Sequence, residues 1–125
     1  ESFARSDDVL ATLVDEAEGA LMRSLDSSRN ALVMEVLAEA GRNARVAEQV
    51  QAADAQVRQT VQHVVRRAWQ AKHPGQSLAD DVVAAKADML AAMVDGIRIR
   101  AIRNPKVNPE ALLTQLRSAV RNLLE

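Results

Sequence analysis

The sequence has no cysteine and only two aromatic residues, Phe3 and Trp69. Without cysteine the chain can form no disulfide bond, no thiolate metal site and no cysteine nucleophile. Its four glycines and three prolines are too few for a β-sandwich or barrel, in which a turn recurs about every ten residues. No apolar run approaches the roughly 20 residues of a membrane span, and the sequence predicts no signal peptide.

Aliphatic side chains supply almost all of the apolar residues, which make up 48% of the chain. Charged residues make up 26%, a balance that is normal for a globular fold. A length of 125 residues is enough for one domain, so we expect residues 1–125 to form a single all-α domain. These features also predict a cytoplasmic protein.

The net charge of −1 is unevenly distributed along the chain. Residues 1–41 carry −6, residues 42–72 carry +4 and residues 73–125 carry +1. The pI of about 6.2 does not indicate the strongly basic surface of a nucleic-acid-binding domain. The chain begins with Glu1 in place of a methionine, which predicts a fragment cut at a domain edge.

Start and stop signals divide the chain into five helices, or six if the third segment is split. Apolar residues spaced three and four apart predict a first helix that is capped by Ser6 and ended by the polar residues 26–28. The same residues 26–28 should cap a second helix, which should end at Gly41 in the left-handed conformation. Asn43 can cap the third helix. The third segment, 44–72, is either continuous or broken within residues 51–56.

Two further helices follow a His-Pro-Gly stop signal. Residues 77–80 resemble a capping box in which Asp80 replaces the usual glutamate. The helix that they open should end at about Arg103. Asn108 followed by Pro109 is a strong start signal for a last helix that reaches the C-terminus. The sequence therefore predicts an all-α, antiparallel bundle of five to six helices.

The last two helices have more apolar surface than one buried face requires. On the final helix the apolar residues cover an arc of about 140°. The helix before it adds a strip of small residues that would let another backbone come close. A two-fold dimer that pairs this hairpin with its copy in a four-helix bundle would bury these faces; the alternative is a monomer with a solvent-exposed alanine face. The residues expected at the dimer interface are Ala85, Met89, Ala92, Gly96, Leu112, Leu113, Leu116, Val120 and Leu123.

Two stretches resemble the regulatory domain of TetR-type (tetracycline-repressor-like) transcriptional regulators. Residues 31–50 are similar to a helix pair of that domain. Residues 87–105 are similar to its long helix, with Asp95 and Gly96 inside and Asn-Pro at the end. The Asn-Pro-Glu start and the leucine-rich last helix complete a resemblance that covers about residues 7–124.

The resemblance implies a dimeric regulator, usually a repressor, whose helical domain binds a small effector and dimerises through its last two helices. In such proteins effector binding changes the separation of two N-terminal helix-turn-helix domains and releases the operator. This sequence contains no helix-turn-helix, so we expect operator DNA to be bound only through the missing N-terminal domain. The alternative is a stand-alone helical dimerisation or adaptor module without an effector.

Catalytic and metal-binding motifs are lacking. The two histidines, His63 and His73, do not have metal-ligand spacing, and no serine lies in a nucleophile motif or a phosphate loop. We therefore expect no enzymatic activity, no metal and no cofactor. Basic groups at residues 66–72 and 98–106 are explained by helix dipoles or, alternatively, by contact with phosphate or nucleic acid.

An effector pocket between the first four helices would be lined mainly by Ala, Val, Leu and Met, with Phe3 as a further wall. Such a lining favours an apolar or amphipathic effector over a nucleotide or sugar. Asp81, Asp88 and Asp95 repeat every seven residues, either as a solvated stripe or with one of them facing this cavity or a subunit contact. The residues expected to bind the effector, with core packing as the alternative, are Met22, Met34, Glu35, Trp69, Met89 and Met93.

Overall fold

The computed structural model describes residues 9–12, 14–16, 19, 22–23 and 25–125, and the regular secondary structure in these residues is α-helical. The all-α prediction is therefore confirmed. The described residues between 9 and 23 are helical and are called the N-terminal helical segment; Phe3 and the proposed cap Ser6 lie outside the described residues. The remaining helices are α2 (Ser27–Ala40), α3 (Ala44–Lys72), α4 (Asp80–Arg103) and α5 (Pro109–Leu124).

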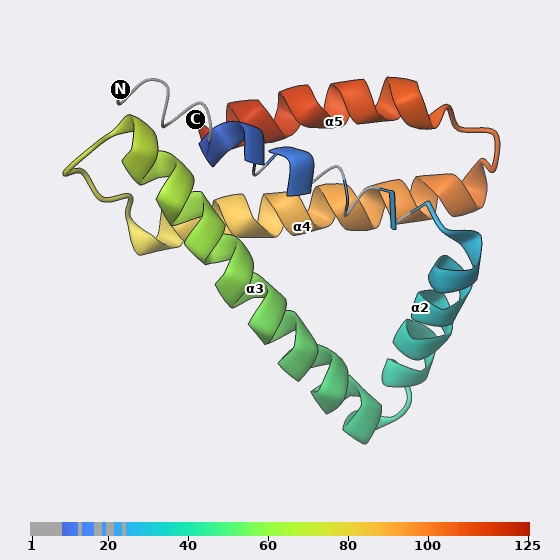
Figure 1. Cartoon of the computed structure of the whole chain (residues 1–125). Helices are drawn as coiled ribbons and strands as arrows, with labels where there is room; N and C mark the ends of the chain where they lie inside the picture. The colour runs from blue at the N-terminus through green and yellow to red at the C-terminus, as the bar shows by residue number, and fades with distance from the viewer. Residues whose placement is uncertain (1–8, 13, 17–18, 20–21, 24) are drawn as a thin grey trace.

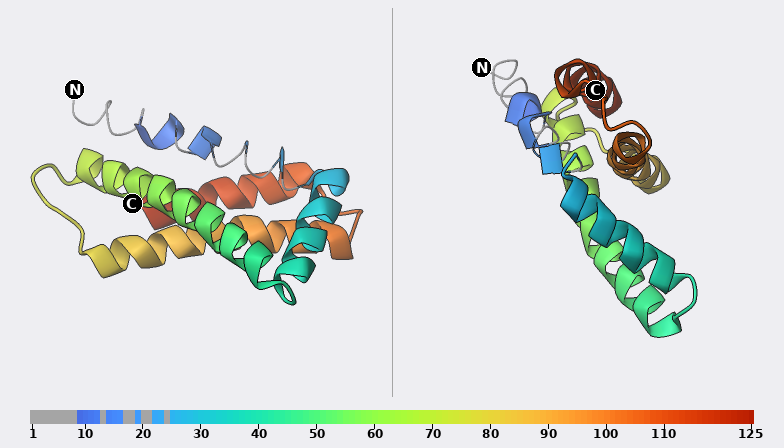
Figure 2. Two further views of the ribbon diagram at one scale, coloured as in Figure 1. Left: turned by 90° about the horizontal axis from the view of Figure 1, so that it is seen from below. Right: turned by 90° about the vertical axis from the view of Figure 1, so that its right-hand side faces the viewer.

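Helices α4 and α5 run antiparallel as a hairpin, whereas α3 leaves α4 at a wide angle (Figure 1). Helix α2 begins beside α4 and ends at the N-terminal end of α3, so α2, α3 and α4 form the three sides of a triangle (Figure 1). Figure 2 shows α2 and α3 projecting together from the α4–α5 hairpin. No helix in the described ranges is long and apolar enough to cross a membrane.

The hydrophobic core lies where the C-terminal half of α3, the hairpin and the N-terminal helical segment meet. Its buried members are Leu10, Val14, Val65, Ala68, Val83, Ile97, Leu116, Val120 and Leu124. By contrast, every residue from 51 to 60 in the middle of α3 is exposed. Apolar burial therefore fixes one end of α3 firmly against the hairpin and leaves its middle without a packed neighbour.

Side-chain caps fix the starts of three helices at the predicted positions. Asp26, Asn43 and Asn108 each accept a hydrogen bond from a backbone N–H in the first turn of α2, α3 and α5, at 3.1 Å. These N–H groups have no partner within their own helix, so the caps satisfy donors that would otherwise be left to water. The predictions of these three starts are confirmed.

The predicted left-handed conformation of Gly41 is wrong. Gly41 has φ −68° and ψ −16°, which is right-handed. Its N–H and that of Arg42 bond to carbonyls three residues earlier, at Ala38 and Glu39, so the helix ends in a tightened turn that needs no left-handed residue. Among the described glycines, only Gly75 in the α3–α4 connection has a positive φ, at 78°.

The predicted capping box at residues 77–80 is also wrong. Helix α4 begins at Asp80, with Ala79 as its N-cap and no side-chain cap. The Asp80 carboxylate instead accepts a hydrogen bond from Arg66 of α3, at 3.1 Å. The Asp80 side chain therefore contacts α3 and does not form the reciprocal bond of a capping box.

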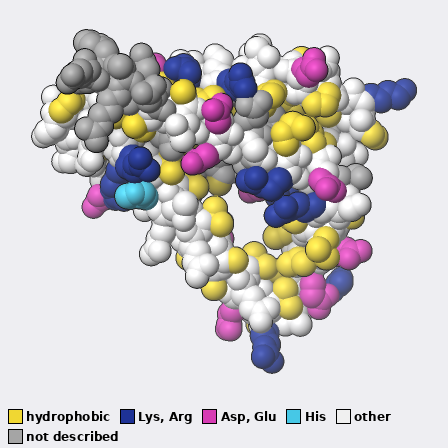
Figure 3. All heavy atoms as spheres, viewed as in Figure 1, with side chains coloured by type: hydrophobic (Ala, Val, Ile, Leu, Met, Phe, Trp, Pro, Cys, Tyr) yellow, Lys and Arg dark blue, Asp and Glu magenta, His cyan; other side chains and the backbone are white. Residues whose placement is uncertain are grey.

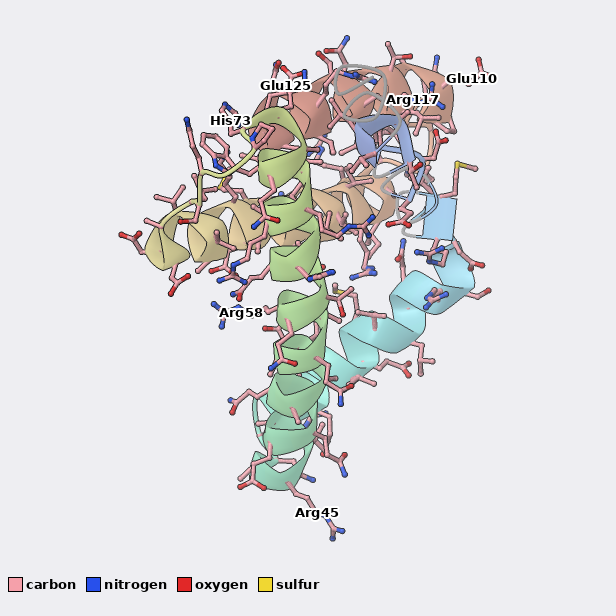
Figure 4. All side chains as sticks on the ribbon, turned by 60° about the vertical axis from the view of Figure 1, so that its left-hand side comes forward. Arg45, Arg58, His73, Glu110, Arg117 and Glu125 are labelled. Carbon is pink, nitrogen blue, oxygen red and sulfur yellow. The ribbon has the colours of Figure 1, made fainter. Side chains whose placement is uncertain are left out.

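Helix α3 is continuous over 29 residues, which decides between the two interpretations of residues 51–56. That stretch contains only Gln, Ala and Asp, and none of these interrupts a helix as Pro or Gly does. Exposed ion pairs join α3 to its neighbours: Arg58 contacts Asp88 of α4 at 3.2 Å, and Lys72 contacts Glu125 after α5 at 3.3 Å (Figure 4). Each such pair contributes at most about 1 kcal/mol.

Candidate functional site

A cavity of about 450 Å³ lies between the N-terminal helical segment, α3, α4 and α5. We call it the central cavity. In the space-filling view an opening passes between α2, α3 and α4, with basic side chains gathered at its edge (Figure 3). The described residues of α2 do not line the central cavity itself. The apolar wall is formed by Val57, Val61, Val64, Leu90, Ala91, Val94, Leu116, Val120 and Leu124. The polar wall is formed by Glu16, Asp54, Thr60, Asp95 and Arg98.

The central cavity exists because the apolar stripe of α3 finds packing partners only near its ends. Val50, Val57 and Val64 lie almost in line on the helix, since seven residues make nearly two turns. Val50 and Val64 are half-buried, but Val57 between them is 53% exposed. The middle of the stripe therefore presents apolar surface to the cavity instead of to another helix.

Arg98 is the basic side chain of the cavity wall, and its position is fixed by neighbours on two helices. Its Nε donates to Oδ1 of Asn30 in α2, at 3.0 Å, and its Nη1 donates to Oδ1 of Asp95, at 3.2 Å. Asn30 is 1% exposed and is the one buried polar residue in the part of the chain that the structure describes. The Asn30–Arg98 bond thus links α2 to α4 at the cavity.

The acidic side chains of the wall are much more exposed than Arg98. The Arg98 side chain is 18% exposed and that of Asp95 is 68% exposed, while Glu16 and Asp54 are exposed as well. Across the described residues, no group of three or more His, Asp and Glu is arranged to hold a metal ion. The acidic groups therefore form a solvated rim, and Arg98 is the most enclosed charge of the wall.

The three regularly spaced aspartates of α4 have different surroundings. Asp95 lies in the wall of the central cavity, which matches one of the two interpretations of this stripe. Asp88 pairs with Arg58, and Asp81 accepts a hydrogen bond from the N–H of Val82 at 2.9 Å. The seven-residue repeat therefore does not mark a single functional face.

The six residues expected to bind the effector are not in the wall of the central cavity. Met22, Glu35 and Met89 are exposed, and Met34 is half-buried. Trp69 is half-buried at the end of α3, where its ring stacks on His73 at 3.7 Å between centroids, with Lys86 Nζ 5.5 Å from the ring. Met93 lines the outer side of the hairpin instead. The expectation rested on side-chain type, whereas the angle between α3 and α4 determines what faces the cavity.

Sequence reasoning missed most of the polar wall, although a weak signal was present. Asp54 and Thr60 lie three residues before and three residues after Val57. This spacing places them about 60° to either side of the apolar stripe. This pattern, two polar residues on either side of a valine in a long helix, could have indicated the polar wall of a cavity.

A second hollow, of about 470 Å³, lies on the outer side of the hairpin, between α4 and α5. We call it the α4–α5 groove. Its floor is apolar and includes Ala92, Met93, Gly96, Ile97, Ile99, Leu112, Leu116 and Ala119. Of the residues expected at the dimer interface, the four on α4 are exposed: Ala85, Met89, Ala92 and Gly96. Of those on α5, Leu112, Leu113 and Leu123 are half-buried, and Leu116 and Val120 are buried within the chain.

Gly96 is open on its outer side. No atom of another described helix lies within 4 Å of the position that a Cβ would take there. Glycine inside a helix costs roughly 0.5–1 kcal/mol relative to alanine. Packing among the described residues therefore gives no reason for a glycine at this position.

Residues 11–125 match the family described as BetI-type transcriptional repressor, C-terminal. The chain belongs to this family of TetR-type regulatory domains, and the resemblance seen in the sequence is confirmed. No curated protein and no solved structure matches the chain significantly.

Proposed function

We propose that the chain is the effector-binding and dimerisation domain of a TetR-like repressor, and that the central cavity holds the effector. The observation that carries this proposal is the unpacked middle of the α3 stripe at Val57, which faces the cavity between the N-terminal helical segment, α3, α4 and α5. A volume of about 450 Å³ falls within the roughly 300–1,000 Å³ of small-molecule pockets.

The composition of the wall supports an apolar or amphipathic effector. Valine, leucine and alanine side chains from α3, α4 and α5 would cover the hydrocarbon part of such a molecule. The polar groups, including Thr60 and Arg98, would contact a single polar end. A sugar or nucleotide has polar groups on all sides and would leave many of them without partners against this wall.

We propose further that the α4–α5 groove pairs with its copy in a two-fold dimer. Exposed apolar residues on α4, among them Met89 and Ile99, form a surface that water disfavours. The open side of Gly96 would allow a helix of the partner to approach closely. Leu116 would form the floor of this interface, while Val120 lies in the wall of the central cavity. In the whole regulator, such a dimer would hold two helix-turn-helix domains at a distance set by the effector.

A thermal-shift screen with small apolar and amphipathic molecules tests the effector site. A ligand at 100 times its dissociation constant stabilises the domain by about 2.7 kcal/mol. Ala91→Trp would fill the central cavity and should abolish the stabilisation. Ala55→Trp, on the exposed side of α3, is the matched control and should retain it. Stabilisation that survives Ala91→Trp, or a library without a single stabilising molecule, would contradict the proposal.

A further inference from the structure

We infer that Arg98 selects the ligand of the central cavity, and that the class it selects is an amphipathic anion, a hydrocarbon chain ending in a carboxylate. This inference rests on the proposed function, because it assigns a chemistry to the same cavity. Three features of the structure carry it: the burial of Arg98, its remaining hydrogen-bond donors and the length of the apolar wall.

The first feature is the difference in exposure among the charges of the wall. The wall has three acidic residues, Glu16, Asp54 and Asp95, against the single basic residue Arg98. A simple count of charges would therefore favour a cationic ligand. However, these carboxylates are exposed, and water and salt screen their interaction with a ligand. Arg98 is 18% exposed, so its field inside the cavity is screened less. The most enclosed charge therefore sets the preference, and that charge is positive.

The second feature is the set of donors that Arg98 still offers. A guanidinium has five N–H donors, and it binds a carboxylate best through two parallel hydrogen bonds. Within the described part of the chain, Arg98 uses Nε toward Asn30 and Nη1 toward Asp95, which leaves Nη2 for a ligand. Because Asp95 is mostly exposed, it regains water when a ligand carboxylate replaces it at Nη1.

Asn30 is the positioning residue in this arrangement. It is buried in the first turn of α2 and accepts from Nε at 3.0 Å. This bond fixes the guanidinium at Nε, while Nη1 bonds to the exposed Asp95 and Nη2 has no partner among the described residues. A donor that is already oriented loses less freedom when the ligand binds. A lysine at position 98 has no such fork and would recognise the carboxylate only as a point charge.

The third feature is the distance between the charged and apolar ends of the cavity wall. Arg98 and Leu90 both line the cavity on α4 and are eight residues apart, which corresponds to about 12 Å along a helix. Val94, midway between them, is apolar and lines the same wall. An extended chain of medium length can therefore lie along α4 with its carboxylate at Arg98. Decanoate is a suitable probe.

The test compares three ten-carbon probes below their aggregation limits: decanoate, decylammonium and decan-1-ol. Binding is measured by titration calorimetry to the unmodified chain and to Arg98→Gln, Arg98→Lys and Arg103→Gln. Arg103 is exposed on the same helix and belongs to neither hollow, so it is the matched control. Circular dichroism establishes that each variant is folded, and Arg98→Lys keeps the positive charge if Arg98→Gln does not fold.

We expect decanoate to bind the unmodified chain at least tenfold more tightly than decylammonium. Arg98→Gln should weaken decanoate at least tenfold and leave decan-1-ol within twofold, whereas Arg98→Lys should retain part of the preference. Arg103→Gln should change none of these affinities. This pattern separates recognition of the carboxylate from a general loss of the cavity.

Tighter binding of decylammonium than of decanoate would overturn the inference and leave the cavity as an effector site. Equal effects of Arg98→Gln on decanoate and decan-1-ol would do the same. If none of the three probes binds, the inference is wrong, and the library screen with Ala91→Trp then decides separately whether the cavity binds an effector.

Discussion

At the scale of single residues, Asn30 is the one polar side chain that is buried among the described residues. It is almost fully enclosed, and a buried amide is tolerated only when it is hydrogen-bonded. Its bond to Arg98 spans 68 positions in the chain. The pair therefore ties the first turn of α2 to the C-terminal half of α4 next to the central cavity.

Asn30→Leu should lower the free energy of unfolding by about 1–3 kcal/mol, because Arg98 Nε loses its acceptor in a partly enclosed site. Asn122→Leu, at an exposed position of α5, is the control and should stay within about 0.5 kcal/mol of the unmodified chain. Urea unfolding followed by circular dichroism measures both. If the two variants were equally stable, the Asn30–Arg98 bond would be of no consequence for the fold.

At the scale of helices, the sequence predicts where elements begin and end wherever the signal is local. Asn43 and Asn108 cap helices within three residues of themselves, and Pro109 has a fixed φ that suits a first turn. The prediction fails at residues 77–80, where the side chain of the expected cap partner contacts another helix. Asp80 bonds to Arg66, 14 residues away, and no pattern in residues 77–80 contains that information.

The central cavity was harder to predict than the helices for a related reason. The sequence places the valines of α3 on one face, but it does not show which of them lack a packing partner. That depends on the angle at which α3 leaves α4, which is set by long-range burial at Val65 and Val83. Val57 and Val65 are the same residue type on the same helix, yet one is exposed and the other is buried.

Gly96 gives a prediction that belongs to α4 as an element. In an Ala92→Glu background, which should be monomeric, Gly96→Ala should raise the free energy of unfolding by about 0.5–1 kcal/mol, since alanine is the better helix former and its methyl meets open space. Without Ala92→Glu, the same methyl would separate the two α4 helices and raise the dissociation constant of the dimer. Thermal unfolding and sedimentation equilibrium measure the two effects. Gly96→Ala with an unchanged dissociation constant would show that no helix approaches Gly96.

At the scale of the whole molecule, burial is concentrated at one end. The hairpin, the end of α3 and the N-terminal helical segment share the core, while α2 and the first half of α3 project from it. A ligand in the central cavity would add contacts where the chain itself supplies few. The outer side of the hairpin has the opposite character: the core supports it from within, and its exposed apolar strip is suited to a permanent partner.

The dimer can be tested at one position of that strip. Ala92 is exposed in the chain and lines the α4–α5 groove. In a two-fold interface Ala92→Glu places two carboxylates in a desolvated seam, which costs several kcal/mol unless they are paired or protonated. Ala55→Glu makes the same change on the exposed side of α3 and is the matched control. Sedimentation equilibrium at micromolar concentration measures the mass of each, with circular dichroism to confirm that the helices persist.

We expect the unmodified chain and Ala55→Glu to sediment as dimers, at twice the 13.6 kDa of the chain, and Ala92→Glu as a monomer. Because the symmetry repeats the substitution on both sides of the interface, its effect on the dissociation constant is counted twice. An unmodified chain that sediments at 13.6 kDa would exclude the dimer at these concentrations. If Ala92→Glu remained dimeric, the dimer would exist but its interface would not include Ala92. The interface would then lie nearer the half-buried residues Leu112 and Leu123 of α5.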